Sequence, residues 1–234
     1  TKNVLEAARS SGTVKKFVFA SSAEVYGEPL KNPVTEDSIT QGKTIYAISK
    51  LAGEELVKAY QDELGAFDTC ILRYFNTYGP GQVGQFVITR FLNKVLNDEQ
   101  PIINGTGEQL RSYCNSKDTA NATVLALEND KSNGMTFNIG NSYEPITLLD
   151  LANRIIQLAG KENQLKPKVL KDKFGDRITN REINYRFSDT SLAESILKFK
   201  AEISLESGLQ ELIDIGFAKE TWETYEKDYD FIVE

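Results

Sequence analysis

Two stretches of the sequence carry side chains that could move a proton. Lys16 to Ser22 form an apolar run that ends in two hydroxyls, and Glu24 follows shortly after. Such a run is typical of a buried parallel strand whose carboxyl end opens into a site. Downstream, the phenol of Tyr46 and the ammonium of Lys50 are four residues apart. They share one face if this stretch is helical.

These side chains suit acid–base chemistry on a sugar-type hydroxyl or carbonyl. A neighbouring cation such as Lys50 lowers the pKa of a phenol from its ordinary value of about 10. The hydroxyl of Ser22 could share the proton or hold a substrate oxygen. Taken alone, Tyr46 would more often be a packing residue and Ser22 a turn or capping serine. The hypothesis therefore depends on their occurring together.

Alternating helices and strands would hold these residues in place. We expect helices over 1–10, 46–64, 86–97, 118–128, 147–159, 188–197, 204–215 and 220–234, strands over 17–20, 69–75 and 135–139, and loops over 27–43 and 161–176. Asp118 and Thr147 are the expected amino-terminal caps of their helices, and Gly65 is expected to end the helix that carries Tyr46. The alternation predicts an α/β fold with a parallel sheet covered by helices on both faces.

Composition excludes several classes of function. The net charge of −7 argues against a surface for nucleic acid or anionic membranes. No apolar run approaches the roughly 20 residues that span a bilayer. The chain has no histidine, which excludes Ser-His and Cys-His nucleophiles and most zinc sites, and we expect no metal site. Cys70 and Cys114 lie far apart, as expected for reduced cysteines of a cytoplasmic protein.

Three motifs occur in an order that resembles a known enzyme family. They are Ser21-Ser22-Ala23-Glu24-Val25-Tyr26-Gly27, Tyr46-Ala47-Ile48-Ser49-Lys50 and Leu72-Arg73-Tyr74-Phe75-Asn76-Thr77-Tyr78-Gly79-Pro80. The chain resembles the extended short-chain dehydrogenases/reductases, and among these the NAD-dependent nucleotide-sugar epimerases and dehydratases of the UDP-glucose 4-epimerase type. The resemblance implies a Rossmann-like, doubly wound parallel sheet within an NAD-binding domain over 1–78 and 118–142. It also implies a smaller lobe over 79–117 and 143–234 that binds a nucleotide-diphosphate sugar.

The resemblance also implies catalytic and cofactor-binding residues. Tyr46 would be the acid/base, Lys50 would assist it and bind the nicotinamide ribose, and Ser22 would hold the 4-oxygen of the sugar. The cofactor would further meet Ser21, Tyr74 and Phe75. Ser21 ranks below Ser22 because pleat alternation points it elsewhere. The implied reaction is C4 epimerisation, in which NAD takes the C4 hydride of a nucleotide-diphosphate hexose and returns it to the other face.

The substrate diphosphate would be held by amide and guanidinium groups. Asn76 and Arg111 match the family's positions for this contact, and a guanidinium suits it by bidentate hydrogen bonding. Ser112 departs from the family's usual aspartate after this arginine. A further arginine would close over the substrate. We expect Arg181 in that role, although the spacing leaves Arg177 and Arg186 open.

Glu24 leaves other reactions open. Family dehydratases place an Asp-Glu pair after the hydroxyl residue, and here Ala23 precedes Glu24. Nucleotide-sugar decarboxylases also keep a glutamate at this point. Decarboxylation therefore stays open beside epimerisation, simple 4,6-dehydration is less favoured, and a surface glutamate in a turn is the alternative.

The family's glycine-rich dinucleotide turn has no counterpart before Ser22. Gly79 to Gly84 match its spacing, but Pro80 lacks the amide that a phosphate cradle needs, and the resemblance assigns this segment to the substrate side. We therefore expect the first strands of the family's sheet to be absent and the serine-bearing strand to lie at an edge. An inactive truncated chain is a third hypothesis. A homodimer through the first helix and the Tyr-Lys helix is the expected assembly.

Overall fold

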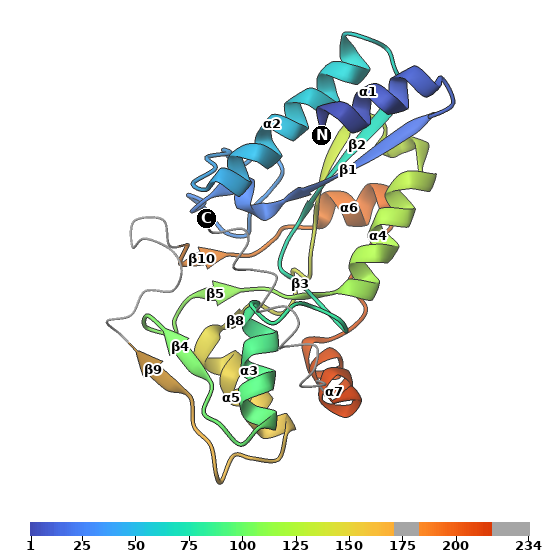
Figure 1. The fold of residues 1–234 in the computed structure, drawn as a ribbon. Coiled ribbons are helices and arrows are strands. Elements are labelled where there is room, and N and C mark those ends of the chain that lie inside the picture. Colours follow the sequence, from blue (N-terminus) through green and yellow to red (C-terminus); the bar gives the residue numbers. More distant parts are fainter. Residues whose placement is uncertain (171–182, 217–234) are drawn as a thin grey trace.

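A parallel sheet of three strands, in the order β1-β2-β7, organises the upper part of the molecule (Figure 1). The computed structural model describes residues 1–170 and 183–216. The strands are β1 (Lys16–Ser22), β2 (Asp68–Tyr74) and β7 (Met135–Ile139). β1 pairs with β2 from Lys16↔Asp68 to Ser22↔Tyr74, so the two strands end side by side. Among the described residues β1 is an edge strand, as the sequence predicts.

Helices cover both faces of this sheet. α1 (Lys2–Ser11) and α2 (Ile45–Asp62) share one apolar core with β1 and β2, while α4 (Ser116–Glu128) and α6 (Ser191–Leu197) share another with β2 and β7. β2 is the most deeply buried strand of this sheet, with Thr69 to Arg73 all buried, because helices pack on both of its faces and a strand lies on each side. The predicted α/β fold, a doubly wound parallel sheet, is confirmed. The proposed domain boundaries stay a prediction, and α6 packs on the sheet although its residues were assigned to the smaller lobe.

A separate core lies below the sheet, built by three amphipathic helices. These are α3 (Val87–Leu96), α5 (Leu148–Leu158) and α7 (Leu205–Ile215). Short strands border them: β3 (Thr77–Tyr78) with β6 (Cys114–Asn115), β4 (Ile102–Asn104) with β9 (Lys168–Leu170), and β5 (Leu110–Arg111) between β8 (Ile146–Thr147) and β10 (Tyr185–Arg186). Two 3-10 helices complete the described elements, η1 (Ala23–Tyr26) and η2 (Asp130–Ser132).

Capping residues explain where the helices begin. The Thr147 hydroxyl accepts a hydrogen bond from the Asp150 amide at 3.0 Å, as predicted for α5. The predicted cap of α4 is wrong: Asn115, not Asp118, accepts from the Lys117 amide at 2.9 Å. Asp118 instead accepts the Ile203 amide at 3.1 Å, a tertiary contact that the local sequence does not reveal.

Other expectations need smaller corrections. The helix expected over 188–197 begins at residue 191, because Ser188 forms a bridge with Val34. β9 lies within the segment expected to be a loop, and the strands of two residues were not predicted. Gly65 takes a left-handed φ of 54° just after α2, as a helix-ending glycine should. The helix expected over 220–234 lies outside the described residues.

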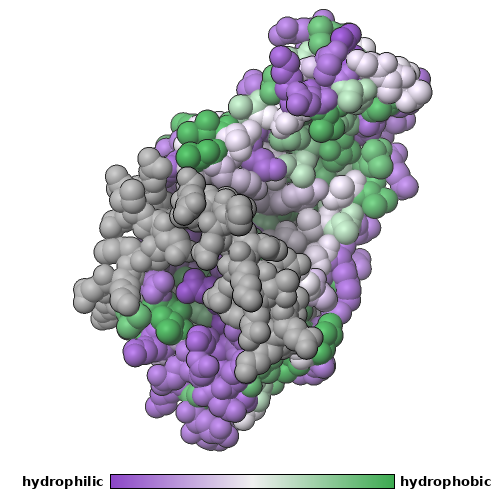
Figure 2. All heavy atoms as spheres, viewed as in Figure 1, coloured by the Kyte–Doolittle hydropathy of each residue, from purple (hydrophilic) through white to green (hydrophobic). Residues whose placement is uncertain are grey.

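Exposed apolar side chains occur on several elements, and one group of them lies on α2. Figure 2 shows this patch over the amino-terminal end of α2, where Ile45 and Ile48 are exposed. Within the described ranges, no helix combines the length and the hydropathy needed to cross a membrane. Cys70 and Cys114 are buried free thiols, and burial raises the pKa of each to about 11.

Candidate active site

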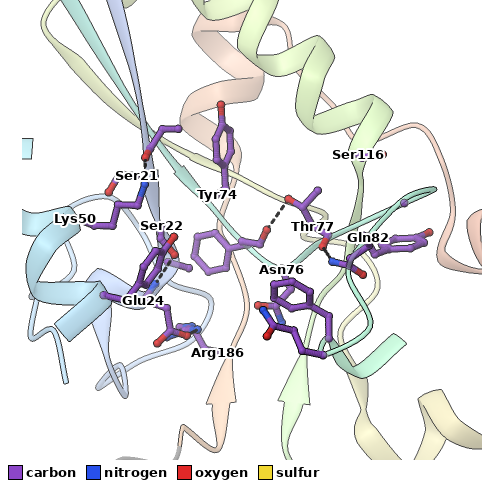
Figure 3. A pocket seen from close by; sticks show the side chains of 18 of the residues that line it. Ser21, Ser22, Glu24, Lys50, Tyr74, Asn76, Thr77, Gln82, Ser116 and Arg186 are labelled. Carbon is purple, nitrogen blue, oxygen red and sulfur yellow. Dashed lines mark hydrogen bonds and ion pairs between the residues drawn. The ribbon is translucent and has the colours of Figure 1, made fainter. Parts of the chain in front are cut away.

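A pocket of about 990 Å³ opens where β1 and β2 end (Figure 3). This is where open parallel sheets place their ligands. Eight of the predicted site residues line it: Ser21, Ser22, Glu24, Tyr46, Lys50, Tyr74, Phe75 and Asn76. Residues from two strands and a helix thus converge on one cavity, as the motifs indicated.

Tyr46 and Lys50 lie on successive turns of α2. Thr44 caps this helix by accepting the Ala47 amide at 3.1 Å, which places Tyr46 in the first turn. The Lys50 ammonium lies 5.5 Å from the centroid of the Tyr46 ring and donates a hydrogen bond of 2.7 Å to the Ala20 carbonyl. Burial lowers the pKa of Lys50 from its ordinary value. Tyr46 is 51% exposed, so its phenol is open to a substrate.

Ser22, at the end of β1, and Glu24, in η1, face the same pocket. The Ser22 hydroxyl oxygen accepts the Glu24 amide at 3.2 Å, so Ser22 caps η1, and its O–H can still donate. Glu24 forms an ion pair of 2.5 Å with Arg186, which also donates to the Gly27 carbonyl at 3.3 Å. Figure 3 shows the two side chains meeting beside the cavity. Glu24 is therefore a half-buried member of the pocket wall rather than a free surface side chain.

Ser21 and the aromatic residues of β2 take different positions. The buried Ser21 hydroxyl donates to the Glu54 carboxylate of α2. The Tyr74 hydroxyl shares a hydrogen bond of 2.8 Å with Thr123, and the Phe75 ring is buried. All three line the pocket, and their role at a cofactor stays a prediction.

A second pocket of about 390 Å³ adjoins the first and is rich in guanidinium groups. Arg90, Arg111 and Arg186 line it, with Asn76 shared between the two pockets. The Arg111 guanidinium donates to the carbonyls of Leu110 at 2.8 Å and Asn184 at 3.0 Å, and also to that of Ile183. Arg111 therefore fixes the segment that leads to Arg186.

The arginines were only partly predicted. Arg177 and Arg181 lie outside the described residues, so the choice of Arg181 stays a prediction. Arg186 is described and pairs with Glu24. Arg90 was not predicted, although its place in the first turns of α3, directly after the glycine turn, was an available signal.

The turn Gly79–Gly84 borders the first pocket between β3 and α3. The Gln82 side-chain amide donates to the Thr77 carbonyl at 2.7 Å and closes the turn. A Cβ atom on Gly79 would lie 2.1 Å from the Ser116 hydroxyl, so close packing on α4 accounts for this glycine.

Comparison with known proteins gives consistent results. Residues 1–140 match the model of the NAD dependent epimerase/dehydratase family. A putative UDP-glucose 4-epimerase of Methanocaldococcus jannaschii is 34% identical over 220 residues, covering 92% of this chain and 67% of that protein. A dTDP-D-glucose 4,6-dehydratase of Bos taurus is 35% identical over 161 residues, which are 69% of this chain and 44% of that protein.

Two further comparisons extend the range of activities. A UDP-N-acetyl-alpha-D-glucosaminuronate decarboxylase of Bacillus cytotoxicus is 31% identical over 221 residues, covering 91% of this chain and 66% of that protein. The crystal structure of UDP-glucuronic acid 4-epimerase from Bacillus cereus, in complex with UDP-glucuronic acid and NAD, superposes with a TM-score of 0.78 at 30% identity. That alignment covers 90% of this chain and 64% of the other. The chain thus spans about half to two thirds of the length of these proteins.

Proposed function

Because the chain belongs to the NAD-dependent epimerase/dehydratase family, we propose that it catalyses C4 epimerisation of a nucleotide-diphosphate hexose. One observation carries this proposal: Ser22, Tyr46 and Lys50 line a single pocket, with the Lys50 ammonium 5.5 Å from the Tyr46 ring. A phenol, a cation and a hydroxyl are the groups needed to move a proton at a sugar oxygen.

The donor set of this pocket fits the nicotinamide ribose of NAD. An ammonium carries three N–H donors, and Lys50 gives one to the Ala20 carbonyl, which leaves two for ribose hydroxyls. Tyr46 would contact the same ribose, and Tyr74 and Phe75 would border the ring. When bound, NAD would supply a hydride acceptor for C4 and return the hydride to either face of the 4-keto sugar.

The protein's own residues handle the proton. Tyr46 takes the proton of the 4-hydroxyl and later gives it back to the 4-oxygen. Lys50 stabilises the phenolate through its positive charge, and the Ser22 O–H donates to the 4-oxygen and orients the sugar.

The second pocket suits the diphosphate of the substrate. Its lining carries three guanidinium groups, Arg90, Arg111 and Arg186, against the single carboxylate of Glu24. Guanidinium groups bind phosphate oxygens bidentately. Because Asn76 borders both pockets, the sugar would lie at Ser22 while the diphosphate extends toward the arginines.

Decarboxylation or dehydration is the second candidate, and the Glu24–Arg186 pair favours it. The pair places a carboxylate and a guanidinium at the wall beside Ser22. A carboxylate there could act as a base in elimination, and a guanidinium could hold the carboxylate of a uronic acid. This candidate predicts that Glu24→Gln abolishes product formation while oxidation at C4 persists.

The test is turnover of a panel of UDP- and dTDP-hexoses with added NAD, followed by NMR of the C4 configuration. Tyr46→Phe should lower turnover by more than about a hundredfold. Tyr143→Phe is the matched control, because Tyr143 is an exposed tyrosine that lines neither pocket. Near-normal turnover of Tyr46→Phe would refute the assignment, and so would failure of the chain to turn over any hexose of the panel. Calorimetry of NAD binding measures the cofactor separately.

We also propose a homodimer through α1 and α2, supported by the exposed apolar Val4, Ile45 and Ile48. Light scattering after size-exclusion chromatography tests it. A monomeric mass for the chain, or a dimer unaffected by Ile45→Glu, would contradict this assembly.

A further inference from the structure

A buried ion pair lies next to the catalytic residues and takes no part in the chemistry proposed above. Arg73 on β2 and Glu54 on α2 have side chains that are 7% and 1% exposed. The guanidinium donates two hydrogen bonds to the carboxylate, from Nη2 at 2.7 Å and from Nε at 3.0 Å. Glu54 is absent from the lining of both pockets, so it cannot touch a substrate there.

This pair belongs to a larger polar network. The Ser21 hydroxyl donates to the Glu54 carboxylate, and Arg73 Nη1 donates to the Tyr26 hydroxyl at 2.9 Å. The Tyr26 hydroxyl in turn donates to Asn138 Oδ1 at 2.6 Å. The network therefore connects α2, all three strands of the sheet and η1. A buried ion pair is weak evidence for a stabilising role. The role of the Glu54–Arg73 pair therefore lies in the residues that it holds in position.

The helix side of this network is in line with the catalytic residues. Tyr46, Lys50 and Glu54 follow one another at intervals of four residues and lie on one face of α2. Two of them contact neighbouring residues of β1, with Lys50 on the Ala20 carbonyl and Glu54 on the Ser21 hydroxyl. The helix is also in close steric contact with the strand, since a Cβ atom on Gly53 would lie 2.4 Å from the Phe19 ring.

We propose that Glu54 is a positioning residue. Its carboxylate, held by Arg73, fixes Ser21 and thereby sets the place of α2 on β1 that brings Lys50 and Tyr46 into one pocket with Ser22. The chemical meaning of this placement rests on the proposed function, but the placement itself can be measured without substrate or cofactor.

The test measures how fast Lys50 reacts with an acylating reagent, relative to Lys94 in the same molecule. Lys94 lies on α3 in the other core, is partly exposed and pairs with Glu99 at 2.6 Å. Ser21→Ala removes the strand's contact and leaves the Glu54–Arg73 pair intact, while Glu54→Gln removes the carboxylate. Each variant should raise the Lys50:Lys94 ratio by about three- to tenfold. The double variant should show little further increase, because both act through one contact.

Ile155→Val is the control for a general loss of stability. Ile155 is fully buried in the core of α3, α5 and α7, so this change should lower the melting temperature and leave the ratio unchanged. An unchanged ratio in folded Ser21→Ala would overturn the proposal, as would simple additivity in the double variant. If Glu54→Gln does not fold, Ser21→Ala alone decides.

Turnover separates this inference from the proposed function. Where the chain epimerises a nucleotide sugar, Glu54→Gln should lower kcat and leave KM within about twofold, because the substrate pockets are intact. A response of Lys50 without any turnover would uphold the placement and refute the proposed function. Turnover of a nucleotide sugar together with an unchanged Lys50:Lys94 ratio in the variants would uphold the proposed function and refute the placement by Glu54.

Discussion

The carboxylate of Glu24 should stabilise the folded chain through Arg186. The Arg186 side chain is 3% exposed and the Glu24 side chain 17% exposed, with 2.5 Å between their charged groups. Glu24→Gln keeps the shape of the side chain and removes its charge, which leaves a guanidinium buried beside a neutral amide. Removing one partner of a fully buried pair costs about 3–5 kcal/mol.

Two features reduce that figure here. Glu24 keeps some contact with water, and the amide oxygen of glutamine can still accept a hydrogen bond from Arg186. We therefore expect Glu24→Gln to lower the free energy of unfolding by about 2–3 kcal/mol. For a chain of 234 residues this corresponds to a loss of roughly 4–12 °C in melting temperature.

Urea unfolding followed by circular dichroism measures this cost, and the chain offers a matched control. Glu206→Gln makes the same chemical change in an ion pair with Arg154 of similar length, 2.7 Å, but with side chains that are 43% and 61% exposed. An exposed pair contributes only about 0.2–1 kcal/mol. If both variants lose the same small amount, the Glu24–Arg186 pair is not the buried contact described above and the reasoning fails.

Three further predictions concern other parts of the molecule. Arg90→Gln should raise the KM for a nucleotide sugar, or the Kd for UDP, by about tenfold with kcat unchanged. Lys94→Gln on the same helix is the control. Equal affinities of the Arg90→Gln and Lys94→Gln variants for UDP would exclude Arg90 from the diphosphate site. Burial raises the pKa of Cys70 and Cys114 to about 11, so the unfolded chain releases these protons first and stability should fall as pH rises from 9 to 11. Cys114→Ala should weaken that dependence in urea titrations, and an identical pH dependence in both proteins would contradict it. Gly53→Ala should destabilise the chain despite a gain of about 1 kcal/mol in helix propensity, because the added methyl group would lie 2.4 Å from the Phe19 ring. A higher melting temperature for this variant would contradict the prediction and would show that α2 can shift away from β1.

The sequence predicted those parts of the site that depend on local spacing. Tyr46 and Lys50 are one helical turn apart, and Ser22 ends an apolar run, so their positions follow from periodicity alone. The three sheet strands were predicted for the same reason. Strands of two residues, such as β5 and β10, carry no period that a sequence pattern could reveal.

The remaining parts depend on contacts between distant residues. The sequence around Glu24 does not indicate that Glu24 pairs with Arg186. Likewise, the sequence around Glu54 does not indicate that Glu54 pairs with Arg73. The expected cap of α4 was Asp118, but Asn115 caps the helix and Asp118 accepts the distant Ile203 amide instead. Tertiary partners of this kind override local preference.

The pairing of Glu24 with Arg186 also has a consequence for synthesis on the ribosome. The two residues are 162 positions apart in the chain. At about 5–20 residues per second, roughly 10 to 30 s pass between the appearance of the first and of the second. Through most of that interval the nascent chain already contains Ser22, Tyr46 and Lys50, but it lacks Arg186, which lines both pockets. Ligand capture should therefore begin only when synthesis has passed Arg186.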